Sequence, residues 1–241
     1  MGRLQGMTTV LRRGAQYTSS VTAVARTQGP RECLRFTSFR AAENFGDWWW
    51  DIDTMGSRSP ADLGYTDRDF HEYGPASYEV LRFCLDRLTI RAGKSVFVDF
   101  GCGLGRAVIV AGARPFGRVI GIDASRELCA GAARNVARAA SRLRCPVEII
   151  ASDARTFAVP DDADIFFFNN PFFGSVLGTV VGTIRASLRA HPREAQIVYG
   201  NCRAFDEMIR ARESHWIEKT LERRFYKDFV CAFYRCLPHR A

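Results

Sequence analysis

No stretch of this sequence stays apolar over the roughly 20 residues that a membrane-spanning helix needs. The eight cysteines include no C-x-x-C pair, and none of the four histidines stands at metal-ligand spacing from a cysteine pair. A zinc site is therefore not expected, and dispersed free thiols indicate a reducing compartment. The opening residues, MGRLQGMTTVLRRG, show no signal-peptide pattern, so secretion is not expected.

Acidic residues are nearly missing from the first 40 positions. That segment holds seven arginines and one acid, Glu32, for a net charge of +6, whereas the other residues contribute only +2 of the total +8. We therefore expect residues 1–40 to be a basic, disordered tail, and we expect the folded part not to bind nucleic acid. A basic segment poor in acids is also typical of a mitochondrial transit peptide, so the predicted location is the cytoplasm, with mitochondria as the alternative.

Apolar strands and helical segments alternate from residue 75 onward. This alternation predicts an α/β fold: a Rossmann-like, mostly parallel seven-stranded sheet with helices on both faces and an antiparallel C-terminal hairpin. The expected strands cover residues 95–100, 118–123, 147–153, 164–170 and 195–201, followed by a hairpin over 216–226 and 228–236. The expected helices cover 75–88, 106–115, 125–144 and 175–190.

The chain divides by composition into three parts. After the tail, residues 41–92 form a predicted N-terminal cap and first helix, and residues 93–241 form the predicted core. Within the cap, residues 45–75 are rich in aromatic and turn residues without a clear period, which indicates an ordered but irregular segment.

Polar residues follow the ends of four successive predicted strands. Right-handed crossovers bring the carboxyl ends of parallel strands to one edge of the sheet, where ligands bind. The strand ends carry Asp99, Asp123, Asp153 and the pair Asn169–Asn170. Their joint placement predicts a ligand site at this edge.

The glycine turn after the first strand narrows the choice of ligand. It contains Gly101, Gly103 and Gly105. Arg106 stands where a dinucleotide-binding turn would have its third glycine, and Asp99 would repel a pyrophosphate but favour an ammonium. Asp123 lies 18 residues past Gly105, about the spacing at which a carboxylate receives ribose hydroxyls. A ligand with an ammonium near Asp99, a ribose near Asp123 and an adenine near Asp153 matches S-adenosylmethionine (SAM). An enzyme that binds a dinucleotide or a nucleotide sugar is the disfavoured alternative.

Four segments resemble the motifs of class I SAM-dependent methyltransferases: VFVDFGCGLGR, VIGIDAS, SDA and FFFNNPF. The resemblance covers roughly residues 73–237. It implies that the three glycines let the backbone approach the amino-acid end of the cofactor and that Asp99 positions that end. It also implies that Asp123 holds the ribose, and that Asp153 and Ala154 bracket the adenine.

Upstream segments are similar to a group of small bacterial methyltransferases with unassigned acceptors. These segments are DIDTMG, DLGY and HEYGPASYEVLRFCL. In related enzymes, including nucleosomal lysine methyltransferases without a SET domain, a tyrosine loop closes over the cofactor, and Tyr73 matches that tyrosine. The alternative is a surface tyrosine that caps the first helix.

The fourth motif departs from the [DN]-P-P-[YF] pattern of amino-group methyltransferases. It contains Asn169, Asn170, Pro171 and Phe172, with one proline in place of two. The resemblance implies that an asparagine oxygen orients the acceptor amine while Pro171 and Phe172 contact the substrate. We favour Asn170 in the catalytic role because it precedes the proline, and assign Asn169 to the cofactor, although the register is open and both amides could instead cap backbone groups.

The predicted function is SAM-dependent methyl transfer, favoured as N-methylation of an amine on a small molecule. A protein lysine methyltransferase and a non-catalytic SAM-binding protein are the alternatives, and an oxygen or sulfur acceptor also stays open. Candidates for a general base are His71, Asp69 and Glu72 in the cap, and neutral amines need little help from a base.

Overall fold

The computed structural model describes residues 26–237 except 28, 66, 212–214 and 226–227. The chain forms two compact units, Met1–Gly46 and Asp47–Ala241. Helix α2 (Pro30–Trp50) supplies most of the described part of the first unit and continues into the second. Residues 30–40 are thus helical where we expected a disordered tail; residues 1–25 lie outside the described part. No proline or glycine interrupts residues 31–45, so nothing in that stretch breaks a helix.

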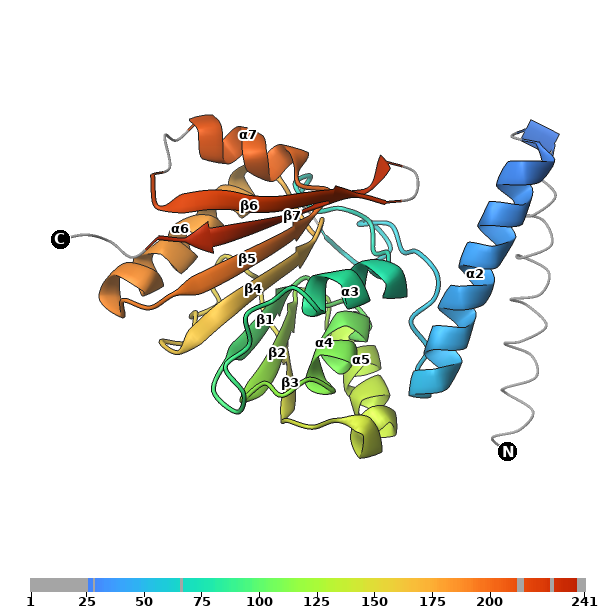
Figure 1. Ribbon diagram of the computed structural model, residues 1–241, viewed down its shortest axis with the longest axis horizontal. Helices are drawn as coiled ribbons and strands as arrows, with labels where there is room; N and C mark the ends of the chain where they lie inside the picture. Colours follow the sequence, from blue (N-terminus) through green and yellow to red (C-terminus); the bar gives the residue numbers. More distant parts are fainter. Residues whose placement is uncertain (1–25, 28, 66, 212–214, 226–227, 238–241) are drawn as a thin grey trace. The chain divides into compact units, whose positions relative to one another are not determined.

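The second unit is built on one seven-stranded sheet, which confirms the predicted fold (Figure 1). The strand order is β3-β2-β1-β4-β5-β7-β6. Strands β1 to β5 are parallel, whereas β7 runs antiparallel to both β5 and β6. The strands are β1 (Val96–Phe100), β2 (Arg118–Asp123), β3 (Val147–Ala151), β4 (Ala163–Asn169), β5 (Ala195–Gly200), β6 (Ile217–Arg224) and β7 (Val230–Cys236).

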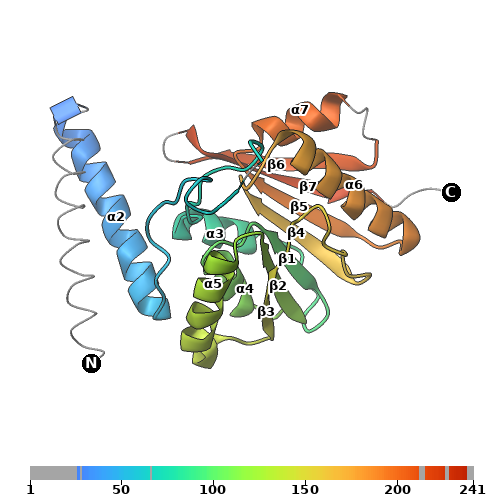
Figure 2. The ribbon, with the colours of Figure 1, turned by 180° about the vertical axis from the view of Figure 1, so that it is seen from behind.

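Helices cover both faces of the sheet, as Figures 1 and 2 show from opposite sides. Along β1, Val96, Val98 and Phe100 join one apolar core, while Phe97 joins the other. The first core packs under α6 (Gly174–Ala190) and α7 (Arg203–Ala211). The second packs under α3 (Tyr78–Leu85), α4 (Arg106–Gly112) and α5 (Arg126–Ala139), which is followed by the short 3-10 helix η1 (Ala140–Arg142). The two-residue period of the strand therefore places Asp99 on the same face as Phe97.

The strand order changes direction between β1 and β4, which makes this the topological switch point of the sheet. Strands β2 and β3 lie to one side of β1, and β4 and β5 lie to the other. Ligands in open α/β sheets bind outside the carboxyl ends of the strands at this point. The loop between α2 and α3 crosses this edge (Figure 1). In the part of the chain that the structure describes, no helix is both long and apolar enough to cross a membrane.

A buried ion pair anchors the cap to the first motif. Arg106, the first residue of α4, is only 2% exposed. Its guanidinium donates to Asp47 Oδ1 at 2.9 Å, to Thr54 Oγ1 at 2.7 Å and to the Ala76 carbonyl at 3.0 Å. One side chain therefore ties three positions of the cap, residues 47, 54 and 76, to the helix that follows the glycine turn.

A second anchor comes from Asn135 on α5. Its amide accepts from the Asp53 backbone N–H at 3.1 Å and donates to the Asp53 carbonyl at 3.1 Å. It also donates to the carbonyl of Leu104, inside the glycine turn, at 2.9 Å. The cap segment near residue 53 is thus fixed to the same turn that the sequence assigns to the cofactor.

Candidate functional site

The glycine turn adopts a conformation that needs glycine at each of its three positions. Gly101, Gly103 and Gly105 have φ values of 85°, 55° and 86°, in the left-handed region that side chains disfavour. A Cβ atom on Gly101 would lie 2.4 Å from the Cβ of Pro171, and one on Gly103 would lie 2.3 Å from Cε2 of Tyr73. The turn is therefore in close contact with the fourth motif on one side and with the cap tyrosine on the other.

Asp123 ends β2 with a carboxylate that is 6% exposed. Its Oδ2 accepts from the backbone N–H of Gly103 at 2.9 Å, and its Oδ1 accepts from the N–H of Ser125 at 2.9 Å. Oδ1 also accepts from the hydroxyl of Tyr65 at 2.7 Å. Burial raises the pKa of Asp123, while these donors favour the charged form and partly offset that rise.

Tyr65 is a site residue that the sequence analysis did not identify. It lies in the segment DLGY, but that segment has no periodicity to say where its side chains point. The sequence pointed to this segment only through its similarity to a group of methyltransferases, which did not single out the tyrosine. The contact with Asp123 across 58 positions becomes visible only in the folded chain.

Asp99 lies behind the glycine turn and is 2% exposed. Its Oδ1 is buried and has no hydrogen-bond partner among the described residues. Burial, with the nearby charge of Asp123 as a second cause, raises the pKa of Asp99 well above its usual range. A buried acid with an unsatisfied oxygen favours a cationic neighbour.

Two asparagines follow β4 with different geometry. Asn169 ends the strand; its Nδ2 donates to the Gly74 carbonyl at 3.2 Å, and its Oδ1 is buried without a partner among the described residues. Asn170 has φ 52°, a left-handed conformation that asparagine tolerates better than most residues. The unsatisfied amide oxygen in this motif therefore belongs to Asn169.

The cap pairs directly with the fourth motif. Phe70 and Phe172 form an antiparallel bridge, and the His71 N–H donates to the Pro171 carbonyl at 3.0 Å. Asp69 Oδ2 accepts from the N–H and hydroxyl of Ser175 at 2.6 and 2.7 Å, which caps the start of α6. These bonds lower the pKa of Asp69. Of the three base candidates, Asp69 is thus committed to capping a helix.

A cavity that is open to solvent lies between the cap and the strand ends, with about 540 Å³ of empty space that includes solvent at its mouth. It lies where open α/β sheets bind their ligands, outside the carboxyl ends of the strands. The predicted residues that line it are Tyr73, Gly101, Asp123, Ala154, Asn169, Asn170, Pro171 and Phe172; others on its wall are Leu63, Tyr65, Phe70, His71, Glu72, Gly74, Ile122, Ala124, Leu128 and Ser152.

Four predicted site residues lie outside this lining. Two of them, Asp99 and Gly103, lie near Asp123 of the cavity wall, and the Gly103 N–H donates to its carboxylate. The third, Gly105, packs closely on Ala132. Asp153 is engaged elsewhere, because both of its carboxylate oxygens accept from the Arg155 guanidinium, at 2.6 Å for the shortest bond. Its neighbours Ser152 and Ala154 face the cavity instead.

These residues fit SAM group by group. The unsatisfied carboxyl of Asp99 suits an ammonium, and Asp123 retains one acceptor position for a ribose hydroxyl. The absence of side chains in the glycine turn lets Pro171 and Tyr73, two residues of the cavity wall, pack directly on its backbone. Ile122, Leu128 and Ala154 supply apolar surface on the same cavity for a purine ring.

The comparisons with known proteins agree with this geometry. Residues 97–191 match the sequence profile of a family described as "Methyltransferase domain". An RNA methyltransferase from Salinibacter ruber, solved with S-adenosyl-L-homocysteine, is 18% identical and covers 70% of this chain and 97% of its own at a TM-score of 0.51. A SAM-dependent methyltransferase from Aquifex aeolicus is 16% identical and covers 75% of this chain and 100% of its own at a TM-score of 0.55.

A third solved structure, a ribosomal protein L11 methylase from Lactobacillus delbrueckii subsp. bulgaricus, is 15% identical and covers 66% of this chain and 78% of its own at a TM-score of 0.51. The curated proteins searched include no match to this chain. Residues 97–191 thus form a methyltransferase domain, and the chain has the fold of SAM-dependent methyltransferases. The predicted cofactor is thereby confirmed as SAM.

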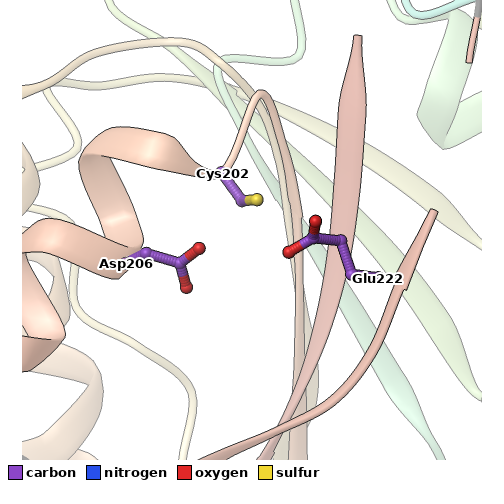
Figure 3. Close-up of side chains that lie close together, drawn as sticks. All are labelled: Cys202, Asp206 and Glu222. Carbon is purple, nitrogen blue, oxygen red and sulfur yellow. The ribbon is translucent and has the colours of Figure 1, made fainter. Parts of the chain in front are cut away.

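A second polar cluster lies away from this cavity, between α7 and β6 (Figure 3). Ligand atoms of Cys202, Asp206 and Glu222 lie within 4.8 Å of one another. The Lys219 ammonium donates to both carboxylates, at 2.7 Å in the case of Glu222. Burial, together with the charge of Asp206, raises the pKa of the Cys202 thiol to about 11. The cluster already contains its own cation, and we assign it a structural role.

Proposed function

We propose that this methyltransferase methylates the nitrogen of an amine carried by a small molecule. The observation that supports this proposal most directly is the buried, unpartnered Oδ1 of Asn169 beside a cavity walled by Phe70 and Phe172. A buried hydrogen-bond acceptor without a donor costs roughly 1–3 kcal/mol. An N–H group of the substrate amine would supply the missing donor. Bound SAM supplies an electrophilic methyl group, so the protein must present a nitrogen lone pair to it.

The asparagines would act by orientation. Because Asn169 Nδ2 donates to the Gly74 carbonyl, its Oδ1 is the free acceptor of that amide. Asn170 is next in the chain and lines the same cavity, so its amide can accept a second N–H of the amine. Two acceptors fix the direction of the remaining lone pair, and positioning of this kind can be worth 10²-fold or more in rate.

His71 is the best placed group to take the proton of a charged amine. It lines the cavity, and no hydrogen bond to its ring nitrogens occurs among the described residues. Burial lowers the pKa of His71, with a partly opposing effect from Glu72, so its ring is neutral near pH 7. Glu72, also on the cavity wall, would attract a cationic amine to the entrance.

The acceptor can be tested with methyl-labelled SAM and three separate substrate pools: small amines, soluble proteins and RNA. We expect label in the small-amine pool. The balanced charge of the folded part led us to expect no binding of nucleic acid. The similarity to an RNA methyltransferase does not support that expectation, so the experiment must include the RNA pool. Label only in protein or only in RNA would overturn the small-molecule proposal and name the acceptor class instead.

Variants of the asparagines test the orienting role. Asn170→Gly removes the amide while keeping the left-handed backbone, and should lower kcat by about 10²-fold with little change in SAM affinity. Asn169→Ala should have a comparable effect if its oxygen also holds the amine. The matched control is Asn201→Gly, since Asn201 is exposed, has φ 57° and lies outside the cavity. Equal activity in all three variants would remove the asparagines from the mechanism.

A further inference from the structure

We propose that Tyr65 is a latch on the cofactor site: its hydroxyl and the cofactor ribose compete for the carboxylate of Asp123. The proposal rests on SAM binding at Asp123 and is independent of which acceptor the enzyme methylates. Tyr65 donates to Asp123 Oδ1 at 2.7 Å from a cap loop 58 positions earlier in the sequence.

The competition follows from counting hydrogen bonds on Asp123. A carboxylate offers about four acceptor positions. Three are filled, by the N–H groups of Gly103 and Ser125 and by the Tyr65 hydroxyl. One position is left, whereas the two hydroxyls of a ribose need two. One of the three present donors must therefore leave before Asp123 can hold both hydroxyls.

Tyr65 is the donor that can leave. Gly103 belongs to the tightly packed glycine turn, and the Ser125 N–H precedes α5, whose N-terminus the Ser125 side chain caps. Tyr65 instead follows Gly64, which has φ 72° and no atom within 4 Å of an added Cβ, so the loop has free space there. Its own backbone N–H bonds within the loop, to the Pro60 carbonyl at 2.9 Å.

The latch also reaches the acceptor side of the cavity. The Tyr65 ring stacks on Phe70 with centroids 4.8 Å apart, and Phe70 meets Phe172 edge-on at 6.2 Å. Release of Tyr65 from Asp123 removes one support of Phe70, which forms part of the wall beside the fourth motif. Cofactor binding would thereby prepare the acceptor pocket and favour an order in which SAM binds first.

The test compares two variants that each lose one tyrosine–aspartate hydrogen bond of 2.7 Å. Tyr65→Phe removes the bond to Asp123, and the control Tyr234→Phe removes the bond to Asp206, which is outside the cavity. Calorimetry with S-adenosylhomocysteine should show about 10-fold tighter binding to Tyr65→Phe, because a charge-assisted hydrogen bond no longer has to break. Tyr234→Phe should bind like wild type.

Unchanged or weaker binding to Tyr65→Phe would overturn the latch, since the hydroxyl would then be structural or would itself hold the cofactor. A second measurement uses the wild-type chain: amide exchange of residues 59–65 should speed up when S-adenosylhomocysteine saturates the protein. Slower or equal exchange there also contradicts the latch. Failure of the ligand to bind wild type at all would overturn the cofactor site itself, which is a distinct result.

Discussion

Asp99 shows how function shapes a single residue of this site. Its carboxyl is buried at the end of β1 with one oxygen unsatisfied, and a charged neighbour, Asp123, lies nearby. Burial and that neighbour both favour the protonated form, so the raised pKa makes the folded protein bind a proton that the unfolded chain releases. Stability from this group is therefore greatest below the ordinary aspartate pKa of about 4 and is lost as the pH rises toward the raised value.

Asp99→Asn should accordingly stabilise the protein when no cofactor is present. We expect a gain of about 0.5–2 kcal/mol at pH 7 that shrinks toward pH 4, and a flatter dependence of Tm on pH. Affinity for S-adenosylhomocysteine should fall by about 10-fold, because a neutral amide replaces the partner of the ammonium. Thermal unfolding from pH 4 to 8 and calorimetry check this; a variant that is less stable at pH 7 and binds normally would contradict it.

Most polar residues at the strand ends could be predicted from the sequence, and the cap residues could not. Asp99 and Asp123 follow short apolar runs, so strand geometry alone brings them to one edge. Tyr65 reaches Asp123 from an irregular loop, where no period relates sequence to direction. The sequence analysis used Arg106 only as the residue that replaces the third glycine of a dinucleotide-binding turn. In the structure its side chain anchors the cap through three hydrogen bonds.

Among the elements, the cap is held in place by a buried network of polar contacts. The Arg106–Asp47 pair is almost fully buried, with side chains 2% and 5% exposed. Asp47 also accepts from the Thr54 N–H at 2.8 Å and from the Tyr78 hydroxyl at 2.8 Å. A network with this many satisfied groups specifies one position for the segment that covers the cofactor site.

Arg106→Met should destabilise the protein by about 3–5 kcal/mol, because it leaves the charge of Asp47 buried without its partner. The double variant with Asp47→Asn should lose less than the sum of the two single changes, since no charge is then stranded. The control is Arg138→Met, which breaks the exposed pair with Asp51 and should cost at most about 1 kcal/mol. Urea unfolding measures all four; equal losses for the two arginines would contradict an anchoring role.

The regular elements of the core could be predicted, and two helices could not. Strands β1 to β5 match apolar runs bounded by turn residues, within a few positions. Helix α7 is only nine residues long, and α2 has apolar residues around its whole circumference, so neither gives a long one-sided pattern. The same scatter leaves Trp48 and Trp49 71% and 55% exposed.

At the scale of the whole molecule, the sheet determines what the site can be. Its strand order places β1 between β2 and β4, so the glycine turn, Asp123 and the two asparagines meet at one edge. Methyl transfer from SAM needs these three groups in contact with one cavity, and the division of the chain at Gly46 keeps all of them in the second unit. The basic character of residues 1–40 therefore belongs to a part of the chain without any of the site residues.

The central claim is that Asp123 and its neighbours bind SAM, and calorimetry with S-adenosylhomocysteine tests it most directly. Wild type should bind at micromolar concentrations and gain thermal stability with ligand, while Asp123→Asn should bind about 10- to 100-fold more weakly. Asp162→Asn, which alters an exposed aspartate paired with Arg118, is the control and should bind like wild type. Thermal stabilisation by NADH but not by S-adenosylhomocysteine, or equal affinity in all three proteins, would contradict the account.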